Sequence, residues 1–340
     1  MAFDKSYMDI TYFLQINRLN MKQIILLISI SLCCVTAYCQ QPDTLIKKLD
    51  SLAIQKDSVK QVNNISPEAY NDQTKITFKS YFILFGSTLK QEFTKPFHMK
   101  KKDWGKLGMF TLASVAVGFA DEPVQKQALK FRANNPQGVK VSKYISSFGG
   151  LYEFYGLGAL GAYSFIFKNQ KLKTTTLLAT QAYLTGGIIE SVLKYLTGRT
   201  RPSFYSPNVE AEPTFKGPFG NLSKDYQGGR SNSSFPSGHA TVAFAAATVY
   251  AMEYKSTVWV PILSYTLATA ISASRITENK HWLTDVFVGS ALGYLSGRHI
   301  VDNYHRYAKI KAGKKSRKDI SFNLQYNYGH FEPGLVYHIR

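Results

Sequence analysis

The sequence predicts an all-α protein, a membrane-embedded bundle of six helices with a short β-hairpin at its C-terminal end. Three observations predict this class. Six apolar segments of helical length follow one another between residues 107 and 295, no strand-like alternation occurs among them, and alternation begins only near the end of the chain. The 340 residues, 45% of them apolar, are enough for one such domain with an extension at each end.

Residues 1–39 are expected to combine an N-terminal extension with a signal peptide that starts at Met21. Lys22 supplies the charged start, residues 24–35 the apolar run, and Ala37-Tyr38-Cys39 the cleavage site. All three cysteines of the chain lie in this stretch, so cleavage leaves a mature chain without disulfides or cysteine-ligated metals. An uncleaved membrane anchor is the alternative.

Residues 40–103 are expected to form a polar lead-in that contains an amphipathic segment. A short helix is predicted at 45–54. The apolar and aromatic stretch 76–89 is followed by the basic stretch 95–106, KPFHMKKKDWGK. Basic flanks of this kind suit a lipid surface.

The helical domain is expected over residues 104–308. Its six apolar segments are 107–120, 151–167, 174–196, 240–252, 258–274 and 283–295. The loop 203–234 is rich in Pro, Gly, Ser and aromatic residues and is longer than ordinary connections, which favours a lid or an interfacial anchor. A loop that simply buries its aromatic residues is the alternative; these residues are Phe204, Tyr205, Phe215, Phe219 and Tyr226.

The tail, residues 309–340, is predicted to be a basic linker followed by a β-hairpin. The linker covers 309–318. Beyond it, apolar residues alternate with polar ones, as in a strand with one covered face. The alternating residues are Phe322, Leu324, Tyr326 and Tyr328, then Leu335, Tyr337 and Ile339.

Two features bear on whether the helices cross a membrane. Most uncharged runs reach only 12 to 16 residues, short of the ~20 that a crossing needs. Only 256–274 is clearly long enough. In favour of crossing, the basic stretches 95–106, 168–173 and 309–318 would all lie on one side of the bilayer. We expect a membrane-embedded bundle, and a bundle that does not span is the alternative.

The chain carries a formal net charge of +19. Such an excess suits nucleic acid, anionic membranes or phosphorylated substrates. Aromatic residues are not interleaved with Lys and Arg as in a stacking platform, and no nucleic-acid motif is present, so nucleic acid is disfavoured as a partner.

Three polar clusters stand at ends of the apolar helices. The first is KYLTGRTRP, with Lys194 and Arg201 followed by Pro202. The second is the sequence Pro236-Ser237-Gly238-His239, in which Ser237 is a good N-cap and Gly238 allows a ligand to approach the backbone. Because helix N-termini present free N–H groups, this position suits a phosphate.

The third cluster is SRITENKHWLTD, which contains Ser274, Arg275, His281 and Asp285. His281 and Asp285 are four residues apart and share a helix face, so the carboxylate can accept the Nδ1 proton and leave Nε2 as a nucleophile. His239 is then available as a general acid. Arg and Lys side chains together can hold a tetrahedral oxyanion.

In order, spacing and residue type, these three clusters match the signature of the type 2 phosphatidic acid phosphatase and vanadium haloperoxidase superfamily, and the chain resembles its phosphatase branch. The matching motifs are Lys194-x6-Arg201-Pro202, Pro236-Ser237-Gly238-His239 and Ser274-Arg275-x5-His281-x3-Asp285. The resemblance spans roughly residues 107–307. It implies a helical bundle of the acid phosphatase and haloperoxidase type.

The resemblance also implies a phosphatase without a metal or other cofactor that works through a phosphohistidine. His281 would attack phosphorus, Asp285 would orient it, and His239 would protonate the leaving group and then help activate water. Phosphate would be held by Lys194, Arg201, Ser237, Gly238 and Arg275. The substrate is expected to be a lipid phosphate or diphosphate at the cell envelope, such as phosphatidate or polyprenyl diphosphate, with the site facing the periplasm.

Three alternatives remain at this point. The apolar helices favour a lipid substrate over the soluble esters that a periplasmic non-specific acid phosphatase would use. The same pocket in a haloperoxidase would hold vanadate, with His281 as its ligand. A non-catalytic envelope binding protein is disfavoured because every residue of the signature is present.

Overall fold

A computed structural model of the chain describes residues 76–205, 211–218, 220, 232–316, 320–327 and 330–337. The predicted signal peptide and the helix expected at 45–54 lie outside the described residues. So does part of the aromatic loop, including Phe219 and Tyr226.

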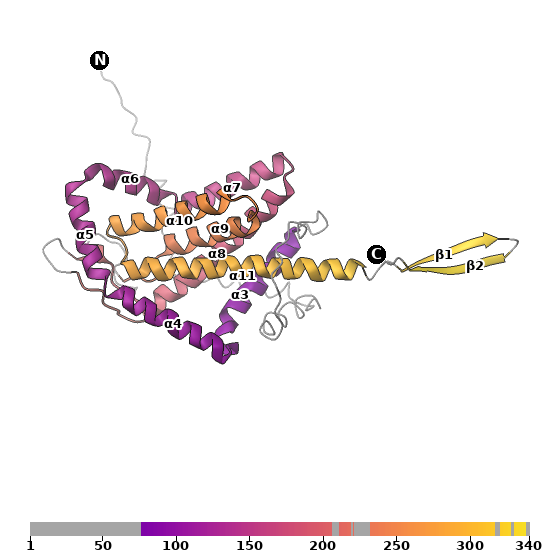
Figure 1. The fold of residues 1–340 in the computed structure, drawn as a ribbon, viewed down its shortest axis with the longest axis horizontal. Coiled ribbons are helices and arrows are strands. Elements are labelled where there is room, and N and C mark those ends of the chain that lie inside the picture. Colours follow the sequence, from indigo (N-terminus) through magenta and orange to yellow (C-terminus); the bar gives the residue numbers. More distant parts are fainter. Residues whose placement is uncertain are drawn as a thin grey trace, which may run out of the picture. The chain divides into compact units, whose positions relative to one another are not determined.

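The described residues contain nine α-helices, where the sequence predicted six (Figure 1). All six predicted segments are helical. They correspond to α4 (Lys101–Gly118), α7 (Leu151–Ile166), α8 (Gln170–Thr197), α9 (Gly238–Glu253), α10 (Trp259–Thr277) and α11 (Leu283–Ser316). The additional helices are α3 (Phe78–Thr94), α5 (Asp121–Asn134) and α6 (Pro136–Ser147).

The helices α5 and α6 lack a continuous apolar run, which is why periodicity alone did not reveal them. Their start signals are nevertheless present in the sequence. The first turn of α5 carries Asp121 and Glu122, which favour a helix N-terminus. Asn135 accepts a hydrogen bond from the N–H of Gly138 at 2.8 Å, and Pro136 opens α6.

Helix α9 occupies the centre of the helical domain and packs against α8, α10 and α11. Its buried face consists mainly of alanines, and α11 meets it with glycines at a spacing of four residues: Gly289, Gly293 and Gly297. A Cβ atom at any of these glycines would collide with the α9 backbone or with the residue before it. The two helices therefore pack backbone against backbone, which brings their N-terminal ends together.

Helix α11 extends to Ser316 and so includes most of the predicted linker 309–318, a stretch rich in the good helix former Lys. After it, β1 (Ile320–Asn327) and β2 (His330–Tyr337) pair antiparallel, with Phe322 opposite Leu335. No single described helix has both the length and the apolar character needed to cross a bilayer; α4 and α5, bent by 46° at their junction, meet that requirement only together.

Candidate active site

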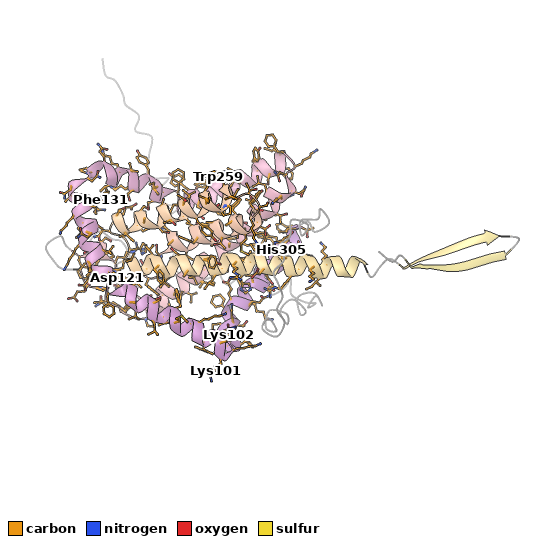
Figure 2. All side chains as sticks on the ribbon, viewed as in Figure 1. Lys101, Lys102, Asp121, Phe131, Trp259 and His305 are labelled. Atoms are coloured by element: carbon orange, nitrogen blue, oxygen red, sulfur yellow. The ribbon has the colours of Figure 1, made fainter. Side chains whose placement is uncertain are left out.

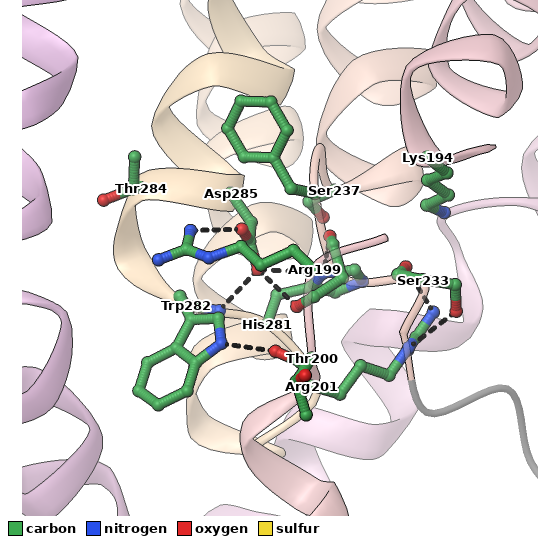
Figure 3. A network of polar contacts seen from close by, with 12 residues as sticks. Lys194, Arg199, Thr200, Arg201, Ser233, Ser237, His281, Trp282, Thr284 and Asp285 are labelled. Carbon is green, nitrogen blue, oxygen red and sulfur yellow. Dashed lines mark hydrogen bonds and ion pairs between the residues drawn. The ribbon is translucent and has the colours of Figure 1, made fainter. Parts of the chain in front are cut away.

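His281 lies between α10 and α11, with only 3% of its surface exposed (Figure 3). Its Nδ1 atom is 2.8 Å from the carbonyl oxygen of Ser234. Because a carbonyl oxygen can only accept, Nδ1 carries the hydrogen and Nε2 keeps its lone pair. The nearest carboxylate oxygen of Asp285 is 3.6 Å from Nδ1. The prediction that the carboxylate itself accepts this proton is corrected: the direct acceptor is the backbone.

Asp285 holds His281 indirectly, through Ser234. The hydroxyl of Ser234 donates to Oδ2 of Asp285, while the carbonyl of the same residue accepts from His281. The backbone N–H of Trp282 also donates to Asp285, at 2.9 Å. Burial raises the pKa of Asp285, and the charge of Arg199 opposes that shift. Ser234 is thus a site residue that the sequence motifs did not reveal.

Arg199 is a second residue that the motifs did not single out, although it stands only two positions before Arg201. Its Nη1 atom donates to Oδ1 of Asp285 at 2.6 Å. Its guanidinium also faces the rings of Phe215 and Trp282, at 4.9 Å and 5.7 Å from the ring centroids. The sequence signal was the repeated arginine in GRTRP.

Three further cations approach His281 from different elements. Lys194, in the last turn of α8, pairs with Glu190. Arg201 follows α8 and donates to the hydroxyl and carbonyl oxygens of Ser233 at 3.1 Å and 3.2 Å. Arg275 closes α10. Burial and then the charges of these three side chains hold the pKa of His281 well below its ordinary value.

His239 is the second residue of α9, and its ring packs against the turn between α6 and α7. A Cβ atom at Gly149 would lie 2.9 Å from Cδ2 of His239, and Gly150 approaches Nε2 with a backbone φ of 87°. Burial, followed by the charges of Arg275, Lys194 and Arg201, lowers the pKa of His239 to about 3. The imidazole is therefore neutral when no anion is bound.

Ser237 precedes α9, as predicted, but its hydroxyl does not cap the helix. Its Oγ atom is buried and has no hydrogen-bond partner among the described residues, while its N–H donates to the carbonyl oxygen of Asp285 at 2.9 Å. A Cβ atom at Gly238 would collide with the Glu190 carboxylate. An unpaired buried hydroxyl at a helix N-terminus is suited to an anion.

The structure brings together the eight predicted site residues, which come from α8, the segment after it, α9, α10 and α11: Lys194, Arg201, Ser237, Gly238, His239, Arg275, His281 and Asp285. Three residues that the prediction omitted contact this group: Glu190, Arg199 and Ser234. A fourth, Asp121, reaches it through Arg199. The arrangement combines a buried imidazole with a free Nε2 and a cluster of cations, which is the chemistry required for nucleophilic attack on a phosphoryl group.

The chain is similar to one protein family and to two curated relatives. Residues 175–308 match the model of the PAP2 superfamily. Over 80 residues the chain is 44% identical to lipid A 1-phosphatase of Porphyromonas gingivalis, covering 23% of this chain and 17% of that protein. Over 153 residues it is 29% identical to undecaprenyl-diphosphatase of Sulfolobus acidocaldarius, covering 44% and 63%. The chain thus spans less than two thirds of the length of either relative.

Two solved structures also align with the chain. One is a transmembrane PAP2 type phosphatidylglycerolphosphate phosphatase from Bacillus subtilis, with 21% identity and a TM-score of 0.39, covering 66% of this chain and 94% of that one. The other is LpxE of Aquifex aeolicus, with 22% identity and a TM-score of 0.36, covering 51% and 91%.

Proposed function

We propose that the protein is a PAP2-type phosphatase of lipid phosphates or diphosphates that works through a phosphohistidine on His281. The premise is the match of residues 175–308 to the model of the PAP2 superfamily, the family that the three motifs resemble. The observation that carries the proposal is the hydrogen bond from Nδ1 of His281 to the Ser234 carbonyl. It fixes the tautomer in which Nε2 is the nucleophile, at a point where Lys194, Arg201 and Arg275 converge.

The proposed reaction has two steps. Nε2 of His281 attacks phosphorus, the bond from phosphorus to the leaving oxygen breaks, and protonated His239 gives its proton to that oxygen. Neutral His239 then takes a proton from water, the water oxygen attacks phosphorus, and the N–P bond breaks to release phosphate and restore His281. Each step passes through a pentavalent phosphoryl group whose charge the three cations stabilise.

The side chains of Ser237 and Lys194 complete this phosphate pocket. The Ser237 hydroxyl, which has no hydrogen-bond partner within the part of the chain that the structure describes, is a donor for a phosphoryl oxygen. The N-terminus of α9 adds partial positive charge. Glu190 binds Lys194, so an incoming phosphate competes with this carboxylate for the ammonium group. Since the protein side chains supply the positive charge, we propose that the reaction needs no metal cofactor.

A lipid substrate is supported by the exposed apolar surface of the helical domain. Large apolar side chains are exposed on several helices, among them Leu112 and Phe165, each 72% exposed, and Trp259, 71% exposed. Lys101 and Lys102 lie at the start of α4, while Trp259 lies at the start of α10 (Figure 2). Contiguous exposed apolar surfaces typically contact membranes or other proteins. We place the protein at the membrane of the cell envelope, with the site facing the periplasm.

The experiment is phosphate release by the detergent-extracted protein in the presence of EDTA. Phosphatidate, undecaprenyl diphosphate and p-nitrophenyl phosphate serve as substrates, and vanadate serves as inhibitor. Release from a lipid that vanadate blocks and that His281→Ala abolishes is the expected result. The matched control is His305→Gln, which removes a partly buried histidine bound to Glu253 at the far end of α9. Release from the soluble ester alone would contradict a lipid substrate, and halide oxidation with vanadate and peroxide in place of any release would contradict the phosphatase.

A further inference from the structure

A carboxylate outside the matched domain reaches the site. Asp121 is the first residue of α5, directly after the bend that separates α5 from α4, and is 1% exposed. Its Oδ2 atom accepts from Nη2 of Arg199 at 2.6 Å. Since Nη1 of the same guanidinium donates to Asp285 at 2.6 Å, one arginine joins the two buried carboxylates.

Asp121 also contacts the residue next to Asp285. Its Oδ1 atom accepts from the backbone N–H of Thr284 at 2.8 Å and from the hydroxyl of Thr284 at 2.9 Å. Asp121 therefore fixes the first turn of α11 directly and the guanidinium of Arg199 at the same time. Figure 3 shows the bond between Arg199 and Asp285, with Thr284 at the preceding position of α11.

We propose that Asp121 is a positioning residue for the phosphatase reaction, acting through Arg199 and Thr284 to hold Asp285 and to balance the charge behind His281. This inference rests on the proposed function. When His281 bonds to phosphorus its imidazole becomes cationic, and the carboxylate of Asp285 stabilises that charge. Arg199 alone would cancel the carboxylate, whereas two carboxylates sharing one guanidinium leave a net negative charge on the side of His281 away from the phosphate.

Two independent features favour this role over simple helix docking. Full burial of two carboxylates and one guanidinium is costly unless every member is well paired, so such a network stabilises a fold less than apolar packing would. In addition, the network ends on Asp285 rather than on a remote structural residue. Helix α5 lies outside the matched domain, and through Asp121 it contributes to the machinery of the site.

The test is a double-variant cycle of Asp121→Asn and Arg199→Met, with the substrate that the wild-type protein hydrolyses. Asp121→Asn keeps the size of the side chain and its bond to the Thr284 N–H but removes the charge. We expect kcat to fall on the order of 10- to 100-fold, as for other partners that orient a reacting group, with KM within about twofold because the phosphate contacts remain. The double variant should be no less active than Asp121→Asn alone, because both changes act through Asp285.

The matched control is Glu253→Gln, the same loss of charge at a buried ion pair at the other end of α9, about 20 Å from its first turn. It should leave kcat unchanged. A folded Asp121→Asn variant with wild-type kcat, or losses that multiply in the double variant, would overturn the proposal. If Asp121→Asn does not fold, the test compares Arg199→Met with the double variant, which lacks the charges of both Asp121 and Arg199. Equal kcat values of these two variants support the proposal, and a lower kcat in the double variant opposes it. A wild-type protein that releases no phosphate would instead refute the proposed function.

Discussion

The Nδ1 atom of His281 donates its hydrogen to the backbone carbonyl of Ser234 at 2.8 Å, so the tautomer of the imidazole does not depend on a side chain. The carboxylate of Asp285 stands 3.6 Å from the same nitrogen and holds Ser234 through its hydroxyl. Orientation and charge stabilisation of the imidazole are thus divided between a backbone group and a carboxylate, and the two contributions can be separated by mutation.

Asp285→Asn is expected to reduce kcat strongly while leaving measurable turnover, because the Ser234 carbonyl still fixes the tautomer. His281→Ala should leave none, since the nucleophile is gone. Ser234→Ala keeps the carbonyl and loses only the hydroxyl, so its loss should be smaller, about tenfold. Phosphate release by the three purified variants gives the comparison. Equal loss in Asp285→Asn and His281→Ala would mean that the carboxylate is essential to the tautomer.

Arg275→Met should lower kcat by on the order of 10²–10³, the usual effect of removing one donor to the charge of a transition state. Arg275 lies at the end of α10 with its Nε atom buried and without a hydrogen-bond partner among the described residues, so a donor remains for a phosphoryl oxygen. Arg298→Met is the control, because Arg298 has 48% of its side chain exposed and pairs only loosely with Asp302, at 3.8 Å. A similar loss in both variants would contradict the assignment.

Anion binding should be coupled to proton uptake at His239. Burial and three nearby cations lower the pKa of His239 to about 3. A bound phosphate neutralises those cations and raises this pKa, so the complex takes up a proton. Affinity therefore increases as the pH falls from the pKa of the complex toward that of the free site, about 3. Calorimetry of vanadate or phosphate binding at pH 7, in buffers of different ionisation enthalpy, should show about one proton more in the wild type than in His239→Asn. Equal uptake would show that His239 stays neutral.

Stability should depend on the close contact of α9 and α11. Gly293→Ala places a methyl group against the carbonyl oxygen of Thr241 and the backbone of Ala245, so the free energy of unfolding should fall by about 1–3 kcal/mol. Gly187→Ala is the matched control, since nothing lies within 4 Å of a Cβ atom there, and helix propensity alone should stabilise α8 by about 0.5–1 kcal/mol. Thermal unfolding compares the two. A neutral Gly293→Ala would mean that the helices can separate without cost.

Local sequence patterns account for most of the site. Lys194 and Arg201 are seven residues apart at one helix end, and Arg275, His281 and Asp285 surround a single helix junction, so spacing alone places each group. Asp121 carries no such signal, because its partner Arg199 is 78 residues away and nothing in the surrounding sequence specifies the contact. The carbonyl of Ser234 could not be predicted either, since backbone acceptors leave no trace in residue type.

The fold, too, was predictable from local sequence in some parts and not in others. Long apolar runs predicted six helices, and α5 and α6 were missed because their residues are mixed in polarity and only their caps are informative. The glycines of α11 at positions 289, 293 and 297 are visible in the sequence as a four-residue repeat. Their partner helix was not predictable from the repeat, because close packing involves both surfaces.

The most direct measurement is to trap the phosphoenzyme. In His239→Gln, a p-nitrophenyl phosphate substrate can still react, because nitrophenolate leaves without a proton, but the second step lacks its base. The reaction should give a burst of about one nitrophenolate per active site, and 31P NMR and mass spectrometry of protein denatured in base should find phosphate on Nε2 of His281. Phosphate on any other residue, or a burst that persists in His239→Gln/His281→Ala, would contradict a phosphohistidine at His281.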